Sequence, residues 1–356
     1  MLSLSSYALR PAAQGAVAGS ARRALIGSAL FAAVLVGPAC NRTSGSGAAR
    51  DDLTLVPKET DAVVMVNLAQ ARKGPTWQRA VQRLSEDAKG RADYQDFVRR
   101  CQLDPFTQID SVFVALPSNI SESKEYAAIL RGPFDPGRLV SCIRDISRDK
   151  GNAITESEQA GIKVVGIGTP PTFLAAVGKK TLAIGGPAWI RRVAELSTNK
   201  HQGGSAAEHQ ELQALIKRTR TGDSFWWSGR VPASSTERLR NNPLLGPVRS
   251  LHSVSGSIDL KNGLIAHAYL DLGSPADATE LKQNADTQLQ GMRSQPALKM
   301  MGLVGYLSGI KTEAKASTFQ LDVELSQPQV DDLVNRLSGM AGMLGGSPTP
   351  TSPRAN

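Results

Sequence analysis

The sequence contains few of the residues from which metal sites are built. It has 4 histidines and 3 cysteines among 356 residues. A structural zinc site needs about four nitrogen or sulfur ligands at regular spacings. His201, His209 and Glu211 come nearest to such a set, but they straddle Gly203-Gly204 and match no recognised ligand spacing. We therefore predict no metal and no cofactor.

The chain also lacks a G-x-S-x-G nucleophile motif. Serine, histidine and aspartate do meet on a predicted hairpin at 253–272, where a three-residue loop ending in Gly263 gives one apolar face and places Ser257 opposite His267. Asp271 lies four residues from His267 on the same strand, about 13 Å away, too far to orient the imidazole. We predict a solvated polar face here and no catalytic residues.

Basic residues are not gathered into a stripe. The formal net charge is +9, but lysine and arginine occur singly or in pairs along the chain. Nucleic-acid binding proteins concentrate positive charge on one face. This pattern excludes a nucleic-acid partner.

No acidic residue precedes Cys40, whereas Arg10, Arg22 and Arg23 do. An apolar run at 24–36 follows these arginines. A helix of this length spans about 20 Å, and a bilayer core is about 30 Å thick. A basic start, a short apolar run and small residues before a cleavage point are typical of a secretory signal peptide, which we assign to residues 1–39.

The residues at the end of this leader, Gly37-Pro38-Ala39-Cys40, resemble the lipobox of bacterial lipoproteins. The small Ala39 and the position of Cys40 match that motif, while Gly37 replaces the usual leucine. The resemblance implies that Cys40 is acylated and that its acyl chains include palmitate. It also implies that the protein is exported and anchored by this lipid to the cell envelope, at the outer membrane facing the periplasm. Cleavage by an ordinary signal peptidase, which would release a soluble protein, is the alternative. Residues 40–52 are rich in Gly and Ser and predict a flexible tether.

The body is predicted to be α+β, with two similar lobes from an internal duplication, largely antiparallel sheets and helices packed on one face. Asp135-Pro136 and Ser274-Pro275 each follow two strands and open a helix, and they lie 139 residues apart. PAWIRRVAEL and PQVDDLVNRL, also predicted helices, begin 141 residues apart at Pro187 and Pro328. The body resembles duplicated α+β extracytoplasmic proteins of unknown function. We assign lobe 1 to 53–203, lobe 2 to 204–338 with strands at 302–307 and 318–325, and a disordered tail to 339–356.

Two further features bear on function. Trp226 and Trp227 are adjacent on a predicted strand and so face opposite sides, which makes one of them a candidate ligand or partner surface. Cys101 and Cys142 lie on the apolar sides of two predicted helices. Export favours a disulfide between them, but buried free thiols are also common, and we expect two separate thiols.

These observations favour a non-enzymatic envelope lipoprotein that is tethered to the membrane through Cys40. It would act as a binding or scaffold module for an envelope protein or the wall. One alternative is a carrier of an apolar ligand, such as a lipid, between the lobes. A hydrolase with a site assembled from distant segments is the third hypothesis.

Overall fold

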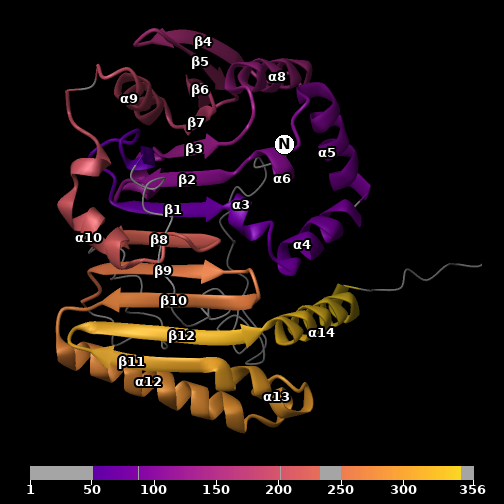
Figure 1. Cartoon of the computed structure of the whole chain (residues 1–356), viewed down its shortest axis with the longest axis vertical. Helices are drawn as coiled ribbons and strands as arrows, with labels where there is room; N and C mark the ends of the chain where they lie inside the picture. Colours follow the sequence, from indigo (N-terminus) through magenta and orange to yellow (C-terminus); the bar gives the residue numbers. More distant parts are fainter. Residues whose placement is uncertain (1–50, 87, 201, 233–249, 346–356) are drawn as a thin grey trace, which may run out of the picture.

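The computed structural model of the chain describes residues 51–86, 88–200, 202–232 and 250–345. Within these residues, twelve strands form one antiparallel sheet in the order β11-β12-β10-β9-β8-β1-β2-β3-β7-β6-β5-β4 (Figure 1). Cys40, the leader at 1–39, His201 and the residues from 346 onward lie outside the described residues.

The first half of the sheet comes from the N-terminal part of the body. Its strands are β1 (Ala62–Asn67), β2 (Ser111–Leu116), β3 (Ala127–Arg131), β4 (Ile154–Gln159), β5 (Ile162–Ile167), β6 (Thr172–Gly178) and β7 (Thr181–Gly185). Its helices are α3 (Leu68–Ala71), α4 (Pro75–Glu86), α5 (Ala88–Cys101), α6 (Pro105–Gln108), α7 (Ile120–Ser123), α8 (Pro136–Asp149) and α9 (Pro187–Ser197).

The second half follows a short helix, η1 (Ala206–Glu208), and α10 (Gln210–Arg218). Its strands are β8 (Phe225–Arg230), β9 (Ser253–Asp259), β10 (Gly263–Asp271), β11 (Ile310–Lys315) and β12 (Thr318–Ser326). Its helices are α12 (Pro275–Ser294), α13 (Pro296–Met300), the 3-10 helix η2 (Val304–Gly309) and α14 (Gln327–Gly345).

The α+β class and the antiparallel pairing are as predicted, but the two halves share a single sheet. Strand β1 pairs with β2 on one side and with β8 on the other, so the hydrogen bonding continues across the boundary. Each half repeats one strand order, β1-β2-β3-β7-β6 in the first and β8-β9-β10-β12-β11 in the second. The expectation of separate lobe sheets is therefore wrong.

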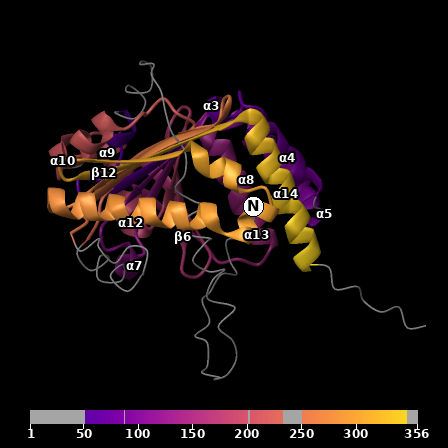
Figure 2. The ribbon, with the colours of Figure 1, turned by 90° about the horizontal axis from the view of Figure 1, so that it is seen from below.

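Helices cover both faces of the sheet, not one face as predicted. Figure 2 shows α9 and α10 on the opposite side of the sheet from α12. The reason is visible in β2, where Phe113 joins the apolar cluster under α9 and α10 while Val112 joins the cluster under α8. A strand that is apolar on both faces needs cover on both.

The long helices begin where the sequence predicted. The Asp135 side chain accepts a hydrogen bond from the Arg138 amide at 3.1 Å, and Pro136 occupies the first turn of α8. The Ser274 side chain likewise accepts from the Asp277 amide at 3.1 Å at the start of α12. Both are side-chain caps of the usual N-terminal kind.

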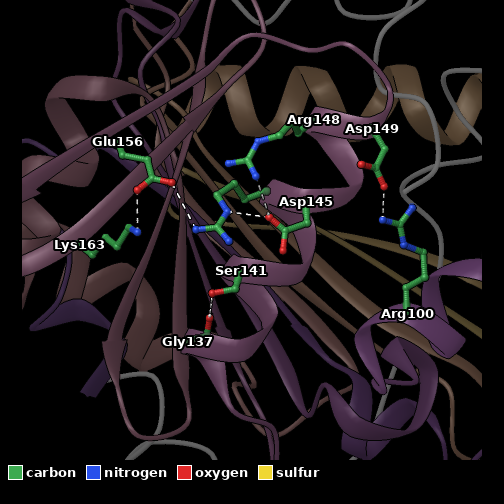
Figure 3. Close-up of polar contacts among 9 residues, drawn as sticks. Arg100, Gly137, Ser141, Asp145, Arg148, Asp149, Glu156 and Lys163 are labelled. Carbon is green, nitrogen blue, oxygen red and sulfur yellow. Dashed lines mark hydrogen bonds and ion pairs between the residues drawn. The ribbon is translucent and has the colours of Figure 1, made fainter.

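Helix α8 is fixed to its neighbours by surface ion pairs (Figure 3). Arg144 pairs with Asp145 at 2.8 Å and with Glu156 of β4 at 3.3 Å, and Glu156 also pairs with Lys163 of β5 at 2.6 Å. At the other end, Asp149 pairs with Arg100 of α5. These exposed pairs contribute little to stability one by one, but they join α8 to both α5 and the outer hairpin.

Helices α5 and α8 are also joined covalently, because Cys101 and Cys142 form a disulfide with a Cα–Cα distance of 5.4 Å. The prediction of two separate thiols is wrong. Both cysteines border the same apolar cluster beneath α8, which brings the end of α5 against the middle of α8.

Two predicted boundaries and one predicted strand also need correction. Asp52, assigned to the tether, is fully buried and pairs with Arg131, so the folded body includes it. The predicted strand at 302–307 is largely the 3-10 helix η2, where Gly302 adopts a φ of 67° that suits a turn. Helix α14 runs to Gly345, past the predicted start of a disordered tail at 339, because Met340, Ala341, Met343 and Leu344 are good helix formers.

Candidate functional site

The two tryptophans lie on opposite faces, as their adjacency predicted. Trp226 is fully buried in the apolar cluster under α9 and α10, where its ring lies 6.3 Å from that of Phe113. Trp227 is half-buried and packs against the apolar cluster of the second half, on the other face. Trp226 is therefore a core residue, and only Trp227 retains any contact with solvent.

The predicted hairpin register is confirmed. Ser257 lies opposite His267, and Ser253 lies opposite Asp271. On the far side of β10, His267 lies opposite Asp322 of β12. We call the polar side of these three strands the polar face, which comprises Ser253, Ser255, Ser257, His267, Tyr269, Asp271, Thr318, Gln320 and Asp322.

The centre of the polar face is buried, contrary to the expectation of a solvated surface. Ser255 is 0% exposed, and Ser257 and His267 are 1% exposed. The segment that connects α10 to β8, residues 219–224, lies beside them. Its Thr219 hydroxyl is 2.8 Å from that of Ser228 on β8, and Arg220 and Asp223 are near enough to His267 to affect its pKa. Local alternation along the hairpin could not reveal this segment, because it comes from another part of the chain.

His267 is held by a carboxylate that the sequence analysis missed. Its Nδ1 lies 2.7 Å from Asp322 Oδ1, and Gln320 Nε2 donates to the other oxygen of Asp322 at 2.5 Å. The carboxylate partner assigns the imidazole hydrogen to Nδ1, which leaves Nε2 as an acceptor. Burial lowers the pKa of His267 below its ordinary value, so the ring is neutral at pH 7.

Three buried polar atoms near this ring have no hydrogen-bond partner among the described residues. They are His267 Nε2, Ser257 Oγ and Asp223 Oδ2. Burial raises the pKa of Asp223, and the nearby Ser257 hydroxyl opposes that rise without reaching good hydrogen-bond geometry. Unsatisfied buried polar groups are rare in native proteins and cost about 1–3 kcal/mol each. Their concentration here marks the polar face as the candidate site.

A second part of the polar face is fully satisfied. Arg218, the last residue of α10, binds both oxygens of Asp271, with Nη1 at 2.8 Å from Oδ1. Thr318 donates to the same oxygen at 2.8 Å, and Ser253 donates to the other. Burial alone would raise the pKa of Asp271, but the hydrogen bonds from Arg218, Ser253 and Thr318 outweigh it and leave that pKa below its ordinary value.

Ser257, His267 and Asp322 stand in the order of a hydrolase triad, although Asp271, as predicted, does not orient His267. The triad is not assembled in this structure. Ser257 Oγ and His267 Nε2 make no hydrogen bond to each other, and both atoms are shielded from solvent. A nucleophile must reach both its base and a substrate, and this serine reaches neither.

The side of the sheet that carries the polar face is covered differently in the two halves. Over the first half, Trp189, Ile190 and Val193 of α9 pack on an apolar face. The helix at the corresponding place in the second half is α14, whose Val330 instead joins the apolar cluster on the opposite face, together with α12. Over the polar face of the second half, α10 reaches the sheet through Arg218, which donates to Ser255 at 3.2 Å and to Asp271 at 2.8 Å.

Two shallow hollows occur elsewhere on the described surface. One, of about 400 Å³, lies between the outer hairpin and α9 and is lined by Ser157, Gln159, Val164, Phe173, Pro187, Ala188 and Arg191. The other, of about 280 Å³, is lined by Thr54, Leu196, Asn199, Gly204, Ser205 and Glu208. The second hollow lies where the two predicted lobes meet, since its lining comes from both sides of residue 203. Neither hollow is lined by a tryptophan.

The remaining sequence candidates have structural roles. His209 caps α10, its Nδ1 accepting from the Leu212 amide at 3.2 Å, and Glu211 pairs with Arg230. Within the described ranges, no three His, Cys, Asp or Glu side chains are placed to hold a metal ion. In those ranges, too, no helix combines the length and apolarity needed to cross a bilayer.

Comparison with known proteins adds only a weak likeness. No protein-family model matches the chain, and no curated protein matches it significantly. Crystal form I of TP0453 aligns with a TM-score of 0.42 and 14% identity, covering 81% of this chain and 96% of that one. Crystal form III aligns with a TM-score of 0.44 and 14% identity, over 81% and 97% of the two chains.

Proposed function

We propose that this protein is an exported, lipid-anchored, non-enzymatic binding module of the cell envelope, and that its binding surface is the polar face. The observation that carries the proposal is the disulfide between Cys101 and Cys142. Disulfides persist in oxidising compartments outside the cytosol. Together with the leader and the lipobox-like Cys40, this bond supports export and membrane attachment at the envelope, with the outer membrane facing the periplasm as the expected site.

The polar face supports binding better than it supports catalysis. It presents hydrogen-bonding side chains from three adjacent strands of a continuous sheet, which hold them in a fixed register. Rigid strands are good supports for a recognition surface because the side chains need little ordering on binding. Two of the three unpartnered atoms, His267 Nε2 and Ser257 Oγ, belong to it.

We also infer that the two halves arose by internal duplication. The shared strand order supports this, as does the place in the chain order of α8 and α12, each after the third strand of its half, and of α9 and α14, each after the last. On this view, the second half changed an apolar, helix-covered face into a polar one. Such a change is costly for packing and suits a new role in recognition.

The test of the anchor is metabolic labelling with radioactive palmitate, followed by membrane fractionation. The full chain should incorporate label and sediment with membranes, and Cys40→Ser should do neither. Thr43→Ser, which alters the tether and leaves Cys40 intact, is the matched control. A mature protein whose N-terminal cysteine is unmodified, or a Cys40→Ser variant that still carries label, would refute the proposal.

A further inference from the structure

We propose that residues 296–303, which we call the α13 turn, form a second membrane contact, at which Met300 and Met301 enter the headgroup region of an anionic bilayer. This inference rests on the proposed function, because a protein tethered through Cys40 lies next to a bilayer. Three observations carry it: an exposed apolar pair, cations that form no salt bridge, and a backbone that is hydrogen-bonded within the protein.

The α13 turn carries the exposed large apolar side chains of the described residues. Met300 is 88% exposed and Met301 is 37% exposed. Pro296 and Ala297, one helical turn earlier, are exposed as well. Figure 1 shows α13 at a corner of the molecule, beyond the end of α12. Single apolar residues on a surface are ordinary, but adjacent ones at a projecting corner indicate a contact site.

The surroundings of this pair are positively charged. The chain contains no Asp or Glu from residue 287 to residue 312, a stretch that includes Arg293 and Lys299. Both cations are exposed, and neither forms a salt bridge with a described residue. Asp286 and Asp332, on the adjoining helices, are each paired with a cation of their own helix, at 2.5 Å and 2.8 Å. The positive charge beside the methionines is therefore available to an anionic partner.

The backbone of the α13 turn is hydrogen-bonded within the protein. The Met301 amide donates to the Ala297 carbonyl at 3.0 Å, and the Leu303 amide donates to the Leu298 carbonyl at 2.9 Å. The Met301 carbonyl accepts from Arg336 Nη1 at 3.0 Å. Backbone groups that enter an apolar medium without a partner are costly. The turn can therefore place its methionine side chains among lipids while these backbone groups remain paired.

A bilayer suits this turn better than a protein partner does. Two methionine side chains and their neighbours cover far less than the ~800 Å² that each partner contributes to a stable protein interface. Methionine is flexible and adapts to irregular surroundings. Anionic lipids attract nearby Lys and Arg side chains, and salt weakens that attraction. A small apolar tip beside unpaired cations is therefore complementary to the surface of an anionic bilayer.

The first test uses the mature protein with Cys40→Ser, which carries no acyl chain, and measures its sedimentation with vesicles. In low salt it should bind vesicles of equal parts phosphatidylglycerol and phosphatidylcholine, and high salt should release it. Met300→Ser/Met301→Ser should weaken binding about tenfold, whereas Met300→Leu/Met301→Leu should bind like the parent. Lys299→Glu should weaken binding about fivefold or more. Lys179→Glu, the same charge change at an exposed position in the turn between β6 and β7, is the matched control and should have little effect.

A fluorophore at the α13 turn reports whether the contact occurs there. With Cys40 replaced and Cys101 bonded to Cys142, Met300→Cys supplies the single free thiol of the mature protein for labelling with a polarity-sensitive dye. The emission of this dye should shift to the blue when the anionic vesicles are added. Lys179→Cys, labelled in the same way, should show no shift.

Each other outcome overturns the inference. These are failure to bind the anionic vesicles, binding that Met300→Ser/Met301→Ser leaves unchanged, and binding without a blue shift at residue 300, which would place the membrane contact elsewhere. Circular dichroism of each variant identifies a folding failure, and Lys299→Glu then serves as the deciding variant. Because the protein tested lacks the acyl chain, its result is independent of the palmitate experiment, and a failed anchor and a failed second contact can be told apart.

Discussion

Removal of the Cys101–Cys142 disulfide should destabilise the protein substantially. The bond joins residues 41 positions apart in the sequence. In the chain-entropy description, closing a loop of that length restricts the unfolded chain by about 4 kcal/mol at 25 °C. Cys101 is 3% exposed, so alanine is the better replacement, because serine would bury a hydroxyl group. The Cys101→Ala/Cys142→Ala variant should therefore lose about 4 kcal/mol of unfolding free energy.

Urea unfolding, followed by tryptophan fluorescence and by circular dichroism, measures this loss. Each single alanine variant also lacks the bond and should lose nearly as much as the double variant, so the two losses are not additive. Dithiothreitol should lower the midpoint of the natural protein and leave that of the double variant unchanged. A loss below about 1 kcal/mol, the effect of an average substitution, or free thiols at both positions in denatured, non-reduced protein would refute the reasoning.

Two further predictions concern the core. Burial raises the pKa of Asp52 to about 6, although the Arg131 guanidinium opposes that rise. The folded state therefore binds the proton of the Asp52 carboxyl more tightly than the unfolded state does. The stability that this proton contributes is lost as pH rises from about 4 to about 6. Asp52→Asn should flatten stability against pH across that window in denaturation series, and an unchanged slope would contradict the assignment. Trp226→Ala should cost about 3–5 kcal/mol, as for large buried aromatics, and a loss below about 1 kcal/mol in urea unfolding would show that Trp226 is not packed as described.

Local signals in the sequence predicted most single elements correctly. The caps at Asp135 and Ser274 are local, since each side chain bonds an amide three residues ahead. The strand predicted at 318–325 is β12, which ends one residue later at Ser326. Two strands were missed, β4 and β11, which form the two edges of the sheet. Edge strands are largely polar and carry charges, so they show little of the apolar alternation on which such predictions depend.

The candidate site could be predicted only in part. The hairpin register followed from one apolar face, and it placed Ser257 opposite His267 correctly. Asp322 lies 55 residues from His267. The alternation in β12, with Phe319, Leu321 and Val323 on the apolar side, is the sequence pattern that places Asp322 on the polar side. No local pattern says which strand pairs with β10 on its far side.

The sequence by itself determined the starting points of α8 and α12, the register of the β9–β10 hairpin and the opposite directions of Trp226 and Trp227. Each of these depends on residues a few positions apart. Only the tertiary structure decided that β1 joins β8 into one sheet, that Asp322 meets His267, that Cys101 meets Cys142, and that Arg220 and Asp223 lie near His267. These contacts join residues far apart in the chain, and they form because the whole fold buries its apolar surface together; no short stretch of sequence carries that information.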